Sequence, residues 1–134
     1  MTTIAIATAT STAKPASRAG NIALWTLQGL LGAFFLVAAA IPKLVGEATA
    51  VGIFSSIGGD WFRLFIGLVE LAGAIGLVIP RLAAAAGLGL TLLMVGATYY
   101  QVVVFGTPVL AITTVTLGVL AGVVAWARRP RRSA

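Results

Sequence analysis

Residues 61–80 read WFRLFIGLVELAGAIGLVIP, an apolar run in which Arg63 and Glu70 are the charged residues and which Pro80 ends. At 1.5 Å per residue, a helix of about twenty residues crosses the hydrocarbon core of a bilayer, which is about 30 Å thick. The run therefore predicts a membrane-spanning helix over 61–79.

Three further runs have the same character and length, at 22–41, 82–105 and 108–126. Pro42 follows the first run, where it would end a helix, and Pro108 begins the last run, because proline is favoured at the first position of a helix. The chain of 134 residues is 60% hydrophobic and 9% charged, whereas a soluble domain carries roughly 25% charged residues. The sequence thus predicts an all-α fold, a four-helix transmembrane bundle over 21–127.

The basic residues predict the orientation of this bundle, because positive residues favour the cytoplasmic side of a membrane. One end would hold Lys14, Arg18, Arg81, Arg128, Arg129, Arg131 and Arg132. The other end would hold Lys43 and Arg63, offset by Glu47 and Asp60. We therefore expect a multi-pass protein of the cell membrane with both termini in the cytoplasm, residues 1–20 being a flexible tail and 128–134 a basic tail.

The tryptophans and the longest connection agree with this orientation. Trp25 and Trp126 would mark the inner membrane interface and Trp61 the outer one, as an aromatic belt predicts. The connection 42–60 would then face outward, with room for a brief interfacial helix around 48–57.

Two absences limit the chemistry. The chain has no cysteine and no histidine, so it lacks the residues for dithiol exchange, iron–sulfur ligation and the usual haem, copper or zinc sites. We expect no metal and no intrinsic cofactor, so that any redox centre belongs to a ligand or a partner. The net charge of +6 does not indicate nucleic-acid binding, because the basic residues flank hydrophobic segments, where they contact lipid headgroups.

Glu70 is the residue of the predicted bundle whose burial in the membrane would cost the most free energy. It lies about 13.5 Å along the helix from Trp61, near the membrane midplane, where an ionised carboxylate needs either a partner or a proton. Arg63 is seven residues earlier on the same helical face, and Gly67 leaves a notch between the two. A ligand between Arg63 and Glu70 is one interpretation, and a purely structural ion pair is the other.

Further polar residues fall in the same outer half. Lys43 follows the first run, and Tyr99, Tyr100 and Gln101 lie late in the third. Together with Glu70 and Arg63 they make a candidate ligand-binding pocket that opens outward, although consecutive residues of a helix cannot all face inward. The alternatives are snorkelling for the two cations, membrane-belt positions for the tyrosines, and an N-cap role for Asp60.

The segments IPKL at 41–44, RLFIGLVELAGAIGLVIP at 63–80 and LMVGATYY at 93–100 together resemble the DoxX-like family of small four-helix membrane proteins. The family takes its name from a subunit of a membrane complex that passes electrons from thiosulfate to quinone. Other members are described as membrane partners of redox enzymes in oxidative stress and thiol homeostasis. Many members carry a histidine near the position of Tyr99 and Tyr100, and its absence here argues against a proton-transfer role at that position.

Three functions follow as hypotheses. The first is a ligand-binding or scaffolding subunit of a membrane redox system, with a bound quinone and a membrane or peripheral redox-protein partner. Arg63, Lys43 and a tyrosine would donate to the quinone, and Glu70 would exchange its proton. The second is a non-enzymatic assembly protein, including a homo-oligomer, and the third is a small proton-coupled carrier. No nucleophile–base pair, metal set or phosphate loop accompanies Glu70, so we do not expect an enzyme acting on its own.

Overall fold

The computed structural model describes residues 17–130, which form helices and no strand. The elements are α2 (Arg18–Phe34), η1 (Phe35–Ala40, π-helical), α3 (Ile41–Val45), α4 (Ala48–Ser55), α5 (Gly59–Leu77), α6 (Ala83–Tyr99), η2 (Tyr100–Val104, π-helical) and α7 (Pro108–Ala127). Because α2, η1 and α3 are continuous, as are α6 and η2, the chain contains five separate helices within this range. The expected all-α fold is confirmed. The expected tails fall mostly on 1–16 and 131–134, outside the described residues.

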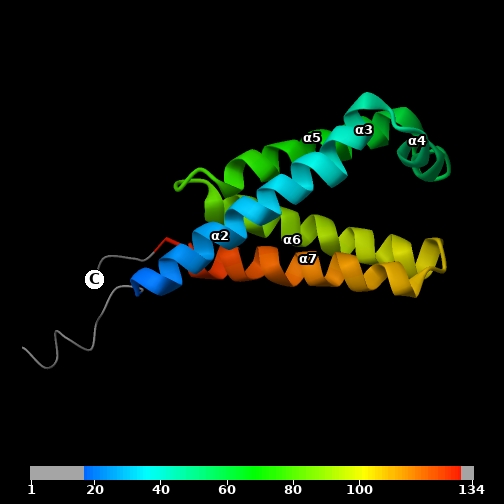
Figure 1. The fold of residues 1–134 in the computed structure, drawn as a ribbon. Coiled ribbons are helices and arrows are strands. Elements are labelled where there is room, and N and C mark those ends of the chain that lie inside the picture. The colour runs from blue at the N-terminus through cyan, green and yellow to red at the C-terminus, as the bar shows by residue number, and fades with distance from the viewer. Residues whose placement is uncertain (1–16, 131–134) are drawn as a thin grey trace, which may run out of the picture.

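The long helices run alongside one another in a bundle that opens at one end (Figure 1). The start of α2, the end of α7 and the α5–α6 connection lie together at the left of the view. The opposite end carries α3, α4 and the α6–α7 connection, and there the pair α3 and α5 diverges from the pair α6 and α7. The widening creates the space in which the candidate site lies.

Three of the helices are long and apolar enough to cross a membrane: 18–45, 83–104 and 108–127. The fourth long helix, α5, has 19 residues but includes Asp60, Arg63 and Glu70. The expected four crossings therefore rest on α5, whose charged residues set it apart from the other three.

The first helix passes through Pro42, where the sequence indicated an end. Proline lacks a backbone N–H, and the helix adjusts by widening into the π-helical turn η1 just before it, in which Ile41 donates to the carbonyl of Leu36. The helix then ends at Gly46, whose φ of 74° favours glycine. Lys43 is consequently part of the helix.

The start of α5 also differs from expectation. Gly58 occupies the N-cap position with a φ of 140°, and Asp60 lies in the first turn, so the predicted N-cap role of Asp60 is wrong. The two preceding glycines supply a backbone turn that other residues adopt poorly, which moves the helix start ahead of Trp61.

Small residues set the spacing of α6 and α7. A Cβ atom at Gly87 would lie 2.7 Å from the carbonyl oxygen of Ala121, so glycine is required where the two backbones meet. The Thr91 hydroxyl lies 2.7 Å from the carbonyl of Gly87 and 3.2 Å from that of Gly118 on the facing helix. Close approach of this kind supplies helix association energy in a lipid environment.

A polar cluster closes the narrow end of the bundle. The buried Gln28 donates from Nε2 to the carbonyl of Leu77 at 2.6 Å and accepts from Nε of Arg128 at 2.7 Å. Arg128 also donates to Asn21 at 2.8 Å and lies 5.0 Å from the ring centroid of Trp25. These contacts join α2, α5 and α7 at this end.

Candidate functional site

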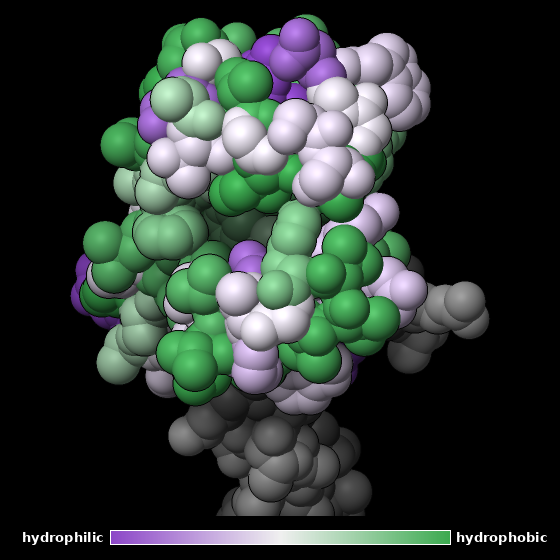
Figure 2. Space-filling model, turned by 90° about the vertical axis from the view of Figure 1, so that its right-hand side faces the viewer, coloured by the Kyte–Doolittle hydropathy of each residue, from purple (hydrophilic) through white to green (hydrophobic). Residues whose placement is uncertain are grey.

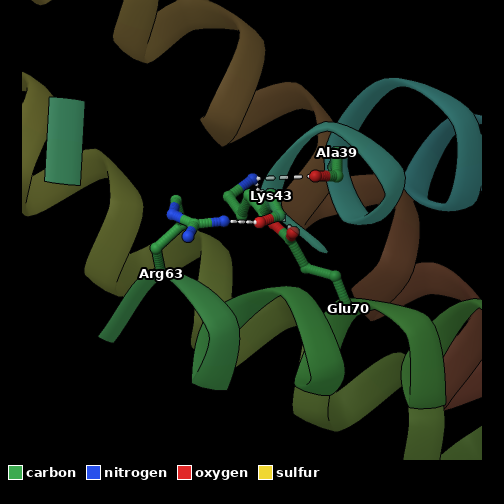
Figure 3. Close-up of polar contacts among 4 residues, drawn as sticks. All are labelled: Ala39, Lys43, Arg63 and Glu70. Atoms are coloured by element: carbon green, nitrogen blue, oxygen red, sulfur yellow. Dashed lines mark hydrogen bonds and ion pairs between the residues drawn. The ribbon is translucent and has the colours of Figure 1, made fainter. Parts of the chain in front are cut away.

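Glu70 and Lys43 form an ion pair between α5 and α3. Nζ of Lys43 lies 2.9 Å from Oε2 of Glu70 and donates to Oε1 at 3.2 Å and to the carbonyl of Ala39 at 3.2 Å (Figure 3). The Glu70 side chain is only 4% exposed and that of Lys43 is 19% exposed. The buried carboxylate thus has a cationic partner, which offsets the free-energy cost of an ionised group in apolar surroundings.

Gly67 makes this pairing possible. A Cβ atom there would lie 3.0 Å from Cβ of Lys43 and 3.1 Å from Cδ2 of Leu44, so a larger residue would press α3 away from α5. The sequence placed the notch on the correct face of α5, between Arg63 and Glu70. The neighbour that fills the notch is α3, which brings Lys43 to Glu70.

Arg63 takes a different role from the one expected. Its side chain rises from α5 on the same side as that of Glu70 (Figure 3), but Nη1 donates to the carbonyl of Lys43. Nε and Nη2 donate to Oδ1 of Asp60 at 3.3 and 3.1 Å. The guanidinium therefore fastens the end of α3 to α5. Arg63 is only 7% exposed, which also argues against a snorkelling side chain that reaches water.

A cavity of about 380 Å³ lies between the diverging helices, with Lys43 and Glu70 in its wall. Its lining is otherwise mainly apolar and comes from all five helices, including Phe35, Ile57, Ile66, Met94, Ala97 and Leu117. Figure 2 shows the hollow from the end that carries α4, with hydrophobic surface around it. Ligand pockets have volumes of about 300–1,000 Å³ and this mix of apolar walls and few polar groups.

The structure separates the three polar residues of the third predicted helix. Tyr100 and Gln101 line the cavity, whereas Tyr99 is 56% exposed and does not line it. Oε1 of Gln101 accepts from the hydroxyl of Thr107 at 2.6 Å, which orients the amide. Of the six candidate residues, the structure brings Glu70, Lys43, Tyr100 and Gln101 to one cavity and leaves Arg63 and Tyr99 outside its wall.

Sequence reasoning missed the aromatic residues around Tyr100. The ring of Phe62 lies 6.5 Å from that of Tyr100 and 5.6 Å from that of Phe54, and Phe105 lies 6.2 Å from Tyr100. All four rings line the cavity. Their sequence signal was weak because isolated aromatic residues are common in membrane segments. Phe54, however, fell within the brief helix that the sequence indicated around 48–57, where the structure has α4.

The charges at the cavity wall balance, and Oε2 of Glu70 can accept a further hydrogen bond. Lys43 and Glu70 neutralise one another, and the nearby Arg63 is paired with Asp60. Oε2 of Glu70 lies 2.9 Å from Nζ of Lys43, and no other described residue donates a hydrogen bond to this buried oxygen. The site therefore suits an uncharged molecule that brings a hydrogen-bond donor.

Comparisons with known proteins identify a family. The model of the DoxX-like family matches residues 26–127, which include every residue of the cavity wall. No curated protein and no solved structure matches the chain. The match confirms the resemblance drawn from residues 41–44, 63–80 and 93–100. Together with this match, the long apolar helices of the chain indicate a membrane protein. The chain belongs to the DoxX-like family.

Proposed function

We propose that this protein is the ligand-binding subunit of a membrane redox system and that its cavity holds the head group of a quinone or quinol. The observation that carries the proposal is the buried Glu70 carboxylate, paired with Lys43 in the wall of an otherwise apolar cavity, whose Oε2 has no donor besides that ammonium group among the described residues. A carboxylate accepts several hydrogen bonds, so a ligand hydroxyl can donate to Glu70 while Lys43 keeps its ion pair.

The residues present fit such a head group. A quinol hydroxyl would donate to Oε2 of Glu70, and a quinone carbonyl would accept from the Tyr100 hydroxyl or from Nζ of Lys43, all in the same wall. The rings of Phe54, Phe62, Tyr100 and Phe105 would pack against a flat ring. The neutral Lys43–Glu70 pair favours an uncharged quinone over the acidic solute that a proton-coupled carrier would take.

We also propose that α5 crosses the membrane as a fourth span, with both termini in the cytoplasm. Supporting this, α5 runs beside α2 and α6 (Figure 1), and its two inward charged residues are paired. The termini then share an end with the basic Arg81, and α4 lies at the outer surface. Because the chain has no cysteine, single cysteines at Ser55 and Arg81 can report the sidedness to a membrane-impermeant maleimide.

In intact cells the maleimide should label Ser55→Cys and leave Arg81→Cys unlabelled until the membrane is opened. Labelling of both cysteines, or of Arg81→Cys alone, would contradict the proposed orientation.

Ligand binding is tested by calorimetric titration of a decyl-substituted benzoquinol and benzoquinone into the protein in lipid nanodiscs. Glu70→Gln should weaken quinol binding by at least about tenfold, because a charge-assisted hydrogen bond contributes about 1.5–3 kcal/mol. Asp60→Asn is the matched control: it also changes a carboxylate to an amide, at an exposed residue that does not line the cavity, and it should leave binding unchanged.

Absence of quinone and quinol binding to the unaltered protein, or equal binding by Glu70→Gln, would overturn the proposal. If the chain instead captured a stable membrane partner irrespective of Glu70, the assembly function would take its place.

A further inference from the structure

The cavity reaches the side of the bundle as well as its wide end. Five residues of its wall are exposed: Phe34, Ile53, Leu92, Gly96 and Thr113. Phe34 is 40% exposed and Leu92 62% exposed. Phe34 lies on α2, and Leu92 and Gly96 lie on α6, two helices that both line the cavity and do not contact each other. The cavity is therefore open between them, at a lateral opening defined here by Phe34, Leu92 and Gly96.

This lateral opening lies at the depth of the membrane core. Phe34 precedes Lys43 by nine positions, which places it about 13 Å farther along the helix axis toward the narrow end. Phe34 and Leu92 both fall near the middle of helices that are long and apolar enough to span a membrane, at 18–45 and 83–104. Exposed residues at this depth face hydrocarbon.

The opening has room for an apolar chain. A Cβ atom built on Gly96 meets nothing within 4 Å, so the space beside this residue is empty. The polar groups of the cavity, Lys43 and Glu70, lie on α3 and α5, whereas the opening is bordered by hydrophobic side chains and a glycine. The cavity thus has a polar region for a head group and an apolar exit for a tail.

We propose that the ligand is a membrane-dissolved amphiphile that enters from the bilayer through the lateral opening, places its head group at Lys43 and Glu70, and leaves its apolar tail in the lipid. This inference rests on the proposed quinone site and adds its route and the class of its ligand. It requires the tail to pass between Phe34, Leu92 and Gly96.

The experiment compares a decyl-substituted benzoquinol with the same head group bearing a methyl in place of the decyl chain, in nanodiscs. Gly96→Trp fills the lateral opening and should weaken binding of the decyl compound on the order of tenfold while leaving the methyl compound unchanged. Gly29→Trp is the matched control, since Gly29 is exposed, has nothing within 4 Å of a Cβ atom, and does not line the cavity.

A second variant acts in the opposite direction. Phe34→Ala enlarges the opening and should speed association of the decyl compound in stopped-flow mixing of loaded liposomes with proteoliposomes, so the test does not depend on Gly96→Trp folding. Equal responses of the two compounds to Gly96→Trp, with no rate change in Phe34→Ala, would overturn lateral entry but leave the head-group site intact. Failure of both compounds to bind the unaltered protein would instead overturn the site itself.

Discussion

Lys43 and Glu70 are 27 residues apart in sequence, yet Nζ of Lys43 lies 2.9 Å from Oε2 of Glu70. The two side chains differ in access to solvent, because the lysine is partly exposed and the carboxylate is buried. Removing either partner therefore has unequal consequences. A lysine left alone can extend toward the wide end, whereas a carboxylate left alone stays in an apolar wall.

We expect Lys43→Met to destabilise the bundle by about 3–5 kcal/mol, the usual cost of a buried charge that has lost its partner. Glu70→Leu should cost less, since Lys43 keeps its bond to the carbonyl of Ala39 and can reach water. Combining the two substitutions should recover much of the stability, because a buried ion pair is often replaced by apolar residues without loss.

The measurement is unfolding of the four proteins in mild detergent, followed by circular dichroism during titration with a denaturing detergent. Asp60→Asn is a suitable control, because its partner Arg63 keeps the bond to the carbonyl of Lys43. A double variant as unstable as the sum of its parents would show that the pair is not energetically coupled.

The sequence identified Glu70 as a buried charge that needs a partner, but it did not identify Lys43 as that partner. Glu70 was identified because a lone acid in an apolar run is conspicuous, and Gly67 because helical periodicity placed it on the same face. The same periodicity suggested Arg63 as the neighbour of Glu70. Which residue fills the notch depends on where the first helix ends, and Pro42 suggested an end before Lys43, whereas the π-helical turn allows the helix to continue.

Two glycines of α6, Gly87 and Gly89, allow a matched comparison, because one lies at the α6–α7 contact and the other does not. Gly87→Ala should destabilise the protein by about 1–3 kcal/mol, because the new Cβ atom would lie 2.7 Å from a backbone oxygen that cannot rotate away. Gly89→Ala meets nothing within 4 Å and should be neutral or stabilise by up to about 1 kcal/mol.

Thermal unfolding of both variants in one detergent measures the difference. If Gly87→Ala proved as stable as Gly89→Ala, the close approach of α6 and α7 would not be required by packing.

The start of α4 should respond to acid. The backbone N–H groups of Thr49 and Ala50 donate to the Glu47 carboxylate at 3.0 and 3.2 Å and lower the pKa of Glu47 from its ordinary value of 4.5. Because the folded-state pKa is the lower one, the stabilising effect of the cap is complete above pH 4.5 and is lost as pH falls through the lowered value.

We therefore expect the first turn of α4 to become more mobile below pH 4.5. A spin label on Ala48→Cys, in that first turn and in a chain with no other cysteine, reports this as narrowing of the spectrum. In Glu47→Gln the label should be mobile at every pH, and an unchanged pH response in that variant would show that another group is responsible.

The cavity itself lay beyond sequence reasoning, because it depends on how far the helices diverge. Each helix is apolar on most faces, so the pattern that identifies spans does not say which apolar residues face a space and which face lipid. The same limit applied to Tyr99 and Tyr100: their adjacency to each other and to Gln101 showed only that the three residues cannot all face inward, and it did not choose between the tyrosines. In the structure the choice falls on Tyr100, which packs between Phe62 and Phe105.

This pair of tyrosines supplies the sharpest comparison for ligand binding. Tyr100→Phe should weaken binding of a decyl-substituted benzoquinone by about three- to tenfold, since it removes one neutral hydrogen-bond donor worth about 0.5–1.5 kcal/mol from the cavity wall. Tyr99→Phe makes the same change one residue earlier, on an exposed side chain, and should leave binding unaltered. Calorimetric titration in nanodiscs distinguishes the two. Equal losses in both variants would indicate a ligand held on the outer surface of α6, and an unaffected Tyr100→Phe would mean that the head group takes its hydrogen bonds from Lys43 and Glu70 alone.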